Sequence, residues 1–215
     1  MFKGIFNEKR KILILLLICF IAMLIMSMLE TVNAKDITIG PNTPGGLKKA
    51  IEIAKNGSTI YMENGVYVTQ DNWYSLDNES EYIDKNLTIK GKGKHVVIDG
   101  QKKHNRLFKI GKFDRDSWTH IQGLATLTLV NLKIMNFIKN NTTEYTGVII
   151  QNGDSLIVNN CIFSDNTLWG AWGGSIIRNG DLATKCNIIN STFINNDFSG
   201  SIHVGGGISM QVLLW

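Results

Sequence analysis

Cysteine is scarce in this chain of 215 residues, which has three in all and no Cys-x-x-Cys pair. A structural zinc site or a dithiol redox motif therefore finds no support in the sequence. Cys19 lies within an apolar run and is interpreted as one of its hydrophobic residues. Cys161 and Cys186 stand in apolar strand patterns, and the sequence leaves open whether they form a disulfide or remain two buried thiols.

Charge is also sparse and nearly balanced. Charged residues make up 19% of the chain and the formal net charge is +4. This excess is too small to predict binding to nucleic acid or to an anionic membrane surface. With 44% hydrophobic residues, the composition is typical of a packed, ordered protein with one domain and a short extra segment.

No charged residue stands between Ile12 and Leu29, and basic residues flank this apolar run on its N-terminal side. Ala34, with Val32 two residues before it, offers a cleavage site. Residues 1–34 are therefore predicted to be a secretory signal peptide, or an uncleaved N-terminal membrane anchor because the run is nearly long enough to cross a bilayer. In both cases residues 35–215 are exported to the cell surface or beyond, and membrane contact is expected only through this segment.

Helical periodicity is rare after the N-terminal segment. It occurs in Leu47–Gly57, where apolar residues recur at helical spacing and lysines occupy the other face. The rest of the chain is typical of short strands of about four to six residues, separated by Gly, Asn or Asp. Three polar stretches, 71–82, 112–120 and 139–146, are predicted to be loops.

Asparagine recurs at a fixed distance beside these strands. Asn131, Asn160 and Asn190 each close a strand, at spacings of 29 and 30 residues. Apolar residues stand before and after each of them at matching offsets. A repeat of this length, with three short strands and no helix, is typical of one coil of a parallel β-solenoid. The sequence therefore predicts an all-β fold in which equivalent residues of successive repeats stack.

These three asparagines are predicted to form a structural ladder. Period-2 counting places each of them on the same interior face as the two apolar residues before it. An amide side chain can bond the amides above and below it, and asparagine tolerates the left-handed backbone of a tight bend. Ile134, Phe163 and Phe193 are expected to form a separate apolar stack on the next wall.

The order of these segments resembles a known family. The stretches "LKKAIEIAKNGSTIYMENGVYV", "NLTIKGKG" and "VVIDGQ", followed by units such as "GGSIIRNG" and "IINSTFINN", are similar to the pectin-lyase-like right-handed parallel β-helix. The chain looks more closely like the adhesin-like surface proteins of methanogenic archaea, over roughly residues 37–210. The resemblance implies that the early helix, Leu47–Lys55, caps the open end of the β-helix. The final "GGGISMQVLLW" shows no cap or anchor, so the β-helix domain 35–215 is expected to be C-terminally incomplete, or to have its last coil covered by something else.

The resemblance implies an exported, adhesin-like protein that attaches to a surface glycan, an envelope protein or a neighbouring cell. Because the repeats specify a scaffold and no catalytic cluster stands out, no enzymatic activity, cofactor or metal is expected. The same fold hosts polysaccharide lyases and glycosidases, which need carboxylates grouped on one wall. Asp99, Asp114 and Asp116 are the candidates for such a site. Asp99 has the pattern of a turn residue, and the other two stand in a polar loop. A structural component of the cell envelope is the third hypothesis.

Trp169 and Trp172, in "LWGAWGG", are the candidate ligand-binding residues. Aromatic side chains in a loop can stack on sugar rings or fill a pocket of a partner. The alternative is a hydrophobic lid packed over a bend. Among the Asn-x-Ser/Thr sequons, those at Asn78, Asn140 and Asn141 are expected to lie in loops, where glycans can be attached.

Overall fold

The computed structural model of the chain divides into two compact units, Met1–Asn33 and Ala34–Trp215. The structure describes residues 14, 17–19, 34–68, 82–103, 106–114, 119–121, 125–141, 146–151, 155–170, 174–179, 185–198 and 206–210. In the first unit, residues 14 and 17–19 are helical, and the rest of the apolar run lies outside the described residues. None of the described helices is both long and apolar enough to cross a membrane. The choice between signal peptide and anchor stays a prediction.

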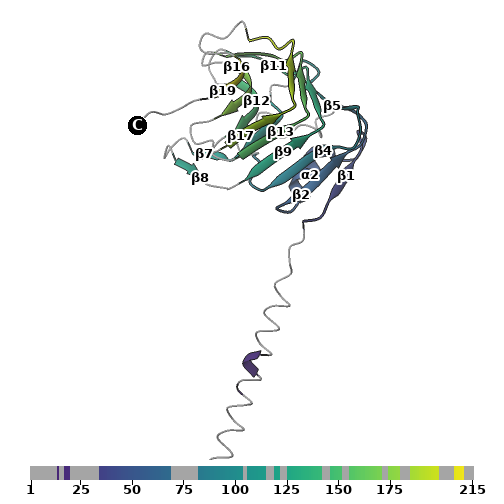
Figure 1. Ribbon diagram of the computed structural model, residues 1–215, viewed down its shortest axis with the longest axis vertical. Helices are drawn as coiled ribbons and strands as arrows, with labels where there is room; N and C mark the ends of the chain where they lie inside the picture. Colours follow the sequence, from purple (N-terminus) through teal and green to yellow (C-terminus); the bar gives the residue numbers. More distant parts are fainter. Residues whose placement is uncertain are drawn as a thin grey trace, which may run out of the picture. The chain divides into compact units, whose positions relative to one another are not determined.

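The second unit is built mainly from parallel β-sheets (Figure 1). Sheet A has six strands, in the order β1 (Ile37–Ile39), β2 (Ser58–Met62), β4 (Leu87–Gly91), β9 (Thr126–Val130), β13 (Ser155–Asn159) and β17 (Lys185–Ile189). Sheet B has five, in the order β3 (Gly65–Tyr67), β5 (Val96–Asp99), β10 (Lys133–Met135), β14 (Ile162–Ser164) and β18 (Thr192–Ile194).

Sheet C has four strands, in the order β6 (Phe108–Ile110), β12 (Thr146–Gln151), β16 (Gly174–Asn179) and β19 (Gly206–Met210). A short parallel pair joins β11 (Ile138–Asn141) to β15 (Thr167–Gly170). One antiparallel hairpin joins β7 (Lys112–Asp114) to β8 (Thr119–Ile121). Every other strand pairing in the described part of the chain is parallel, so the predicted all-β class is confirmed, with parallel sheets.

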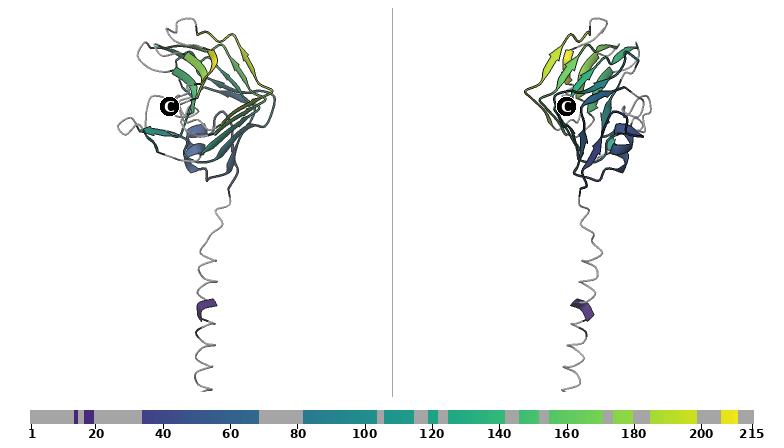
Figure 2. Two further views of the ribbon diagram at one scale, coloured as in Figure 1. Left: turned by 60° about the vertical axis from the view of Figure 1, so that its left-hand side comes forward. Right: turned by 90° about the vertical axis from the view of Figure 1, so that its right-hand side faces the viewer.

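The chain visits sheets A, B and C in a repeating order. Strands β9, β10 and β12 follow that order, and β13, β14 and β16 repeat it. One such pass is termed a round and is named after its strand in sheet A. Each of these six strands pairs with its equivalent in the other round and not with its neighbour along the chain. Figure 2 shows these equivalent strands side by side in each wall.

The register of sheet A follows the spacing of the sequence repeat. Two columns of inward-facing residues cross the last three strands, one formed by Leu127, Leu156 and Cys186 and the other by Leu129, Val158 and Ile188. The members in β9 and β13 are buried, while those in β17 are half-buried. Because full burial of an aliphatic side chain contributes about 1.5–3 kcal/mol, these columns are a main source of cohesion between rounds.

The apolar stack predicted for the next wall is confirmed in sheet B. Ile134, Phe163 and Phe193 are register partners across β10, β14 and β18. The rings of Phe163 and Phe193 stack with their centroids 5.0 Å apart and their planes at 10°. Phe163 is fully buried and Phe193 half-buried, so the stack runs from the core toward the last described round.

Helix α2 (Gly46–Ile53) connects β1 to β2. It buries Leu47, Ala50 and Ile51, which are the positions whose helical spacing predicted it. The helix ends at Ile53 and not at Lys55, because Ala54 already has an extended backbone. The buried face belongs to the same hydrophobic core as the sheet strands, so the helix completes the core at the β1 and β2 end.

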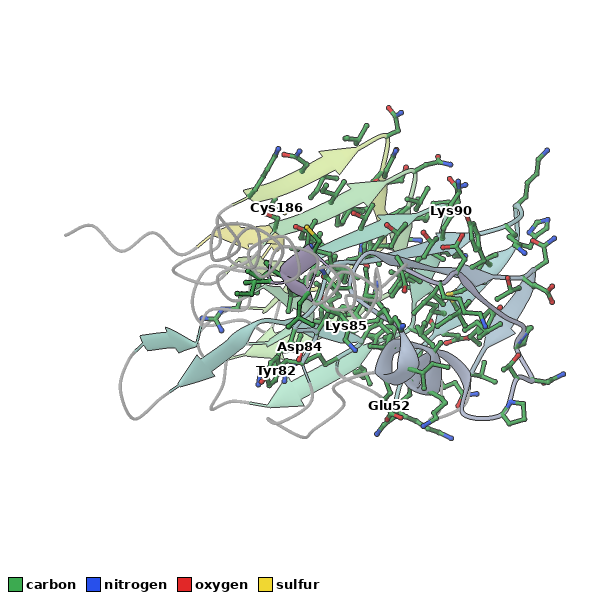
Figure 3. All side chains as sticks on the ribbon, turned by 90° about the horizontal axis from the view of Figure 1, so that it is seen from below. Glu52, Tyr82, Asp84, Lys85, Lys90 and Cys186 are labelled. Atoms are coloured by element: carbon green, nitrogen blue, oxygen red, sulfur yellow. The ribbon has the colours of Figure 1, made fainter. Side chains whose placement is uncertain are left out.

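Lys85 fixes the C-terminal end of this helix (Figure 3). Its ammonium group donates to the carbonyl oxygens of Ile51, Glu52 and Ala54 at 3.3, 3.4 and 3.1 Å. The last carbonyl groups of a helix lack intrahelical partners and carry partial negative charge. A lysine from the segment that leads into β4 therefore satisfies them and ties the helix to the next round.

Tyr67 anchors the turn between β2 and β3 from inside the protein. Its hydroxyl group is within 3.1 Å of the carbonyl oxygen of Ile39 and 2.9 Å of that of Glu63, and it can donate to either. The side chain is fully buried. Burial, followed by the nearby negative charge of Glu63, raises the pKa of Tyr67 to about 12 from its ordinary value of 10.0.

We expect this raised pKa to make the protein less stable in strong base. Below pH 10.0 the hydroxyl is protonated in both the folded and the unfolded chain, so its contribution is fully present. As the pH rises toward about 12, the unfolded chain loses the proton first, and the free energy of unfolding falls. In Tyr67→Phe this part of the fall should disappear. Urea unfolding at about pH 9 and about pH 11 measures it; an identical fall in both proteins would contradict the assignment.

Two stretches predicted as loops contain strands instead. Residues 112–120 hold β7 and most of β8, and residues 139–146 run from β11 to the start of β12. Both stretches are polar, so they lack the alternation of apolar and polar residues from which a strand is predicted. Strand formation depends on pairing with a neighbouring strand, which main-chain groups provide whatever the side chain. The stretch 71–82 lies outside the described residues except for Tyr82.

All three cysteines are free thiols. Cys161 is buried and Cys186 is half-buried. Burial raises the pKa of both thiols above the ordinary value for cysteine. Of the two arrangements that the sequence left open, the structure has two separate thiols that pack as small hydrophobic side chains.

Candidate functional site

Asn131, Asn160 and Asn190 occupy the turn between sheets A and B in successive rounds. All three have a left-handed backbone, with φ of 56°, 54° and 47°. The amide of Asn160 donates to the side-chain oxygen of Asn131 at 2.8 Å. A left-handed backbone costs most residues roughly 1–2 kcal/mol, while asparagine adopts it more easily. Asparagine therefore forms the bend in all three rounds, and Asn160 and Asn131 also link two neighbouring rounds.

The prediction that these asparagines share the interior face with the apolar residues is wrong for Asn160 and Asn190, which are exposed. Asn131 is half-buried. The reason lies in the backbone, because a positive φ ends the alternation of side chains that holds within a strand. The residue that would continue the inward series of Leu129 is thus turned toward solvent, and this ladder lies at the surface.

Two substitutions at Asn160 should separate the backbone role from the side-chain role. Asn160→Gly keeps the left-handed backbone without strain and loses an exposed hydrogen bond, so we expect a change below about 1 kcal/mol. Asn160→Ala loses the same bond and adds backbone strain, so it should lower the free energy of unfolding by about 1–2 kcal/mol. Chemical denaturation of both variants tests this. Equal losses would show that the backbone at this turn is unimportant.

A second column of left-handed residues lies at the turn that follows sheet B. Asn136, Asp165 and Asn195 have φ of 59°, 57° and 51°. The amide of Asn136 donates to Asp99 Oδ1 at 3.0 Å, and that of Asn195 donates to Asp165 Oδ1 at 3.4 Å. Amide and carboxylate groups therefore connect neighbouring rounds at this corner as well.

A third column of polar side chains reaches into the interior. Asn166 is fully buried and Asn196 is half-buried. Its side-chain oxygen accepts the N–H of Phe137 at 2.9 Å, and its amide donates to Asn196 Oδ1 at 2.8 Å. Asn196 in turn accepts the N–H of Asn166 at 3.2 Å and donates to the carbonyl oxygen of Phe163 at 2.9 Å. These bonds satisfy main-chain groups that would otherwise be buried without partners.

The sequence reasoning missed this internal ladder. Asn166 and Asn196 stand 30 residues apart, each directly after a left-handed Asp or Asn, in the pairs "DN" and "NN". The second residue of each pair could have been recognised from this spacing. Period-2 counting could not place it, because the left-handed residue before it resets the alternation.

The three candidate carboxylates do not form a site among the described residues. Asp99 Oδ1 accepts the N–H of Gln101 at 2.8 Å in addition to the amide of Asn136, so it holds a turn. Asp114 belongs to β7, where its register partner is Thr119. Asp116 lies outside the described residues. Within the part of the chain that the structure describes, no group of three or more His, Cys, Asp and Glu residues could hold a metal ion.

The candidate aromatic residues are only partly placed. Trp169 belongs to β15, where its register partner is Asn140 of β11. It is therefore in a strand, as are Asn140 and Asn141, which the sequence placed in a loop. Trp172 and Asn78 lie outside the described residues. A ligand-binding role for the two tryptophans stays a prediction.

One surface feature was not recognised in the sequence, namely the end of β4 together with the turn that connects it to β5. Lys90, Lys92, Lys94 and His95 are all exposed and stand within six residues. Residues 90–95 are termed the basic turn. The stretch "KGKGKH" can be read in the sequence, but the net charge of the whole chain is small and gives no sign that positive charge is concentrated here.

Comparison of the chain with protein-family models, curated proteins and solved structures finds no match.

Proposed function

We propose that residues 35–215 form a right-handed parallel β-helix that acts as an exported, adhesin-like surface protein. The register supports this fold, because residues one repeat apart in the sequence are strand partners in sheets A, B and C. Right-handedness follows from the general rule that parallel strands of one sheet are joined by right-handed crossovers. Helix α2 then caps the β1 and β2 end of the stack.

The observation that carries the adhesive function is the outer face of sheet A. A column of partly exposed side chains crosses five strands in register, formed by Thr59, Thr88, Thr128, Ile157 and Asn187. Neighbouring members of such a column lie about 4.8 Å apart. A rigid wall with evenly spaced side chains suits many weak contacts with a repetitive partner, which is how extended solenoid surfaces bind.

One of the three candidate carboxylates, Asp99, is used within the scaffold, as are several asparagines. Asp99 holds a turn, Asn131 and Asn160 link rounds, and Asn166 satisfies buried main-chain groups. This favours attachment over the polysaccharide lyase or glycosidase alternative, which needs grouped carboxylates. A purely structural envelope component would use the same scaffold, and it differs from an adhesin in having no ligand.

We further propose export through residues 1–34 and a partner that is a surface glycan or an envelope protein, with no cofactor. The test is a binding experiment with the full chain, purified in a non-ionic detergent, on a glycan array and on beads coated with cell-envelope material. An adhesin should retain at least one class of glycan or envelope, and heat-unfolded protein should retain none. Absence of binding to every surface would support the structural envelope component instead.

A further inference from the structure

The charge of this protein is concentrated in one short region. Residues 90–103 contain five lysines and one aspartate, so their formal net charge of +4 equals that of the whole chain. Lys102 and Lys103 are exposed, like the lysines of the basic turn. Lys90 lies at the end of β4, and because β5 occupies residues 96–99, the other four lysines lie in the turns at its two ends. Sheet B is therefore flanked by positive charge at this round.

The basic turn is held firmly against the preceding round. The N–H of Lys92 donates to the carbonyl oxygen of Met62 at 2.8 Å, and the N–H of Gly65 donates to that of His95 at 2.7 Å. The N–H of His95 also donates to Asn64 Oδ1 at 3.1 Å. The backbone that carries the lysines thus has three hydrogen bonds to residues 62–65, where β2 ends and β3 begins.

Two glycines allow this close approach. A Cβ atom at Gly91 would collide with the carbonyl oxygen of Asn131 in the next round, and one at Gly93 would collide with the side chain of Asn64 in the preceding round. The turn is therefore pressed between its neighbours on both sides. A binding partner would meet cations whose backbone is already ordered, which reduces the entropic cost of binding.

The lysines of this turn are available for an anionic partner. None of Lys90, Lys92 and Lys94 forms an ion pair with a carboxylate among the described residues. The ammonium group of Lys92 donates to Thr38 Oγ1 at 3.2 Å and lies 5.1 Å from the centre of the Tyr61 ring. Neither contact neutralises its charge.

We propose that the basic turn binds an anionic polysaccharide, meaning a glycan with carboxylate or sulfate groups repeated along its chain. The inference rests on the proposed function and names the partner class for it. The alternation Lys90, Lys92, Lys94 spreads the cations along the turn, and Lys102 and Lys103 extend them beyond β5, which matches a partner whose charges also repeat. The ammonium group of lysine is a point charge, and it does not require the planar, bidentate contact that arginine makes with a carboxylate or phosphate.

A polysaccharide fits these observations better than nucleic acid does. Nucleic-acid surfaces combine a strong overall positive charge with aromatic side chains that stack on bases. Here the net charge of the whole chain is only +4. The aromatic ring beside the basic turn, Tyr61, already has Lys92 over it.

The test uses the full chain in a non-ionic detergent with four immobilised probes: polygalacturonate, dextran sulfate, uncharged dextran and duplex DNA. The chain should bind one or both acidic glycans, and the two probes distinguish carboxylate from sulfate as the recognised group. Replacing Lys90, Lys92 and Lys94 together by glutamine should weaken this binding about tenfold, the order expected for three exposed ion pairs. Binding should also weaken as salt shortens the Debye length from about 10 Å at 0.1 M to about 3 Å at 1 M.

Two further triple variants serve as controls. Replacing Lys35, Lys49 and Lys55 by glutamine removes the same charge from another exposed group of lysines, and it should change the affinity less than twofold. Replacing Lys90, Lys92 and Lys94 by arginine keeps the charge and should retain binding, which separates loss of charge from misfolding. An equal loss in the Lys35, Lys49 and Lys55 variant, equal binding to uncharged dextran, or tighter binding to DNA would overturn the proposal. If only neutral glycans bind, this inference fails while the adhesive function stands.

Discussion

Phe163→Ala is expected to lower the free energy of unfolding by about 3–5 kcal/mol. Phe163 is fully buried in sheet B between Ile134 and Phe193, and its ring stacks on that of Phe193. Removing the ring leaves a cavity that the neighbouring rounds cannot fill, since strand pairing on both sides fixes their backbones. Because a domain is typically stable by only about 5–15 kcal/mol, this loss should be plain in a urea titration.

Phe193→Ala is the matched control for this prediction. It removes the other ring of the same stack, but Phe193 is half-buried. Its replacement should therefore cost roughly half as much, because less apolar area returns to water and solvent can enter the gap. If both substitutions cost the same, the stack would not extend from the core toward the last described round in the way the register indicates.

Asn166→Ala is the second substitution with a large expected effect, about 2–4 kcal/mol. The variant loses the acceptor for the N–H of Phe137 and the amide group that donates to Asn196 Oδ1. The N–H of Phe137 would then be buried without a hydrogen bond, and a buried unsatisfied polar group costs about 1–3 kcal/mol. The surface asparagine Asn160, replaced by glycine, should lose far less although it also links two rounds.

Hydrogen exchange gives a local test of the same ladder. In the native protein the amide of Phe137 should exchange slowly, because its acceptor is fully buried. In Asn166→Ala this amide should exchange faster, while amides in the middle of sheet A, such as that of Leu129, should keep most of their protection. Uniform loss of protection would mean that the variant unfolds as a whole and that the ladder has no local role.

The spacing of the sequence repeat predicted the register of the strands because stacking requires equivalent residues to meet. Leu129 and Val158 stand 29 residues apart and become partners in sheet A for that reason. The asparagines at 131 and 160 indicated left-handed bends at these positions, because few other residue types adopt a left-handed backbone easily. The internal position of Asn166 was not predictable by counting alternate residues, because the bend before it shifts the pattern.

Features of the protein surface were harder to predict from the sequence than the register of the strands. The polar composition of 112–120 and 139–146 concealed strands whose formation depends on pairing with other segments. The lysines of the basic turn are evident in the sequence, but the rigidity of the turn is not. It depends on contacts of Gly93 and His95 with Asn64, about 30 residues earlier in the chain. The sequence offered Asp99 both as a candidate carboxylate and as a turn residue, and its hydrogen bonds to Gln101 and Asn136 agree with the turn.

The central claim is that this protein attaches to its partner without cleaving it. One sample can test both halves, with the full chain incubated with polygalacturonate in the presence and absence of Ca²⁺. The bound fraction is measured by co-sedimentation, and unsaturated products and reducing ends are measured in the supernatant. We predict bound protein with no products above the protein-free background. Products that increase with protein concentration would contradict the claim, and would turn attention to Asp114 and Asp116.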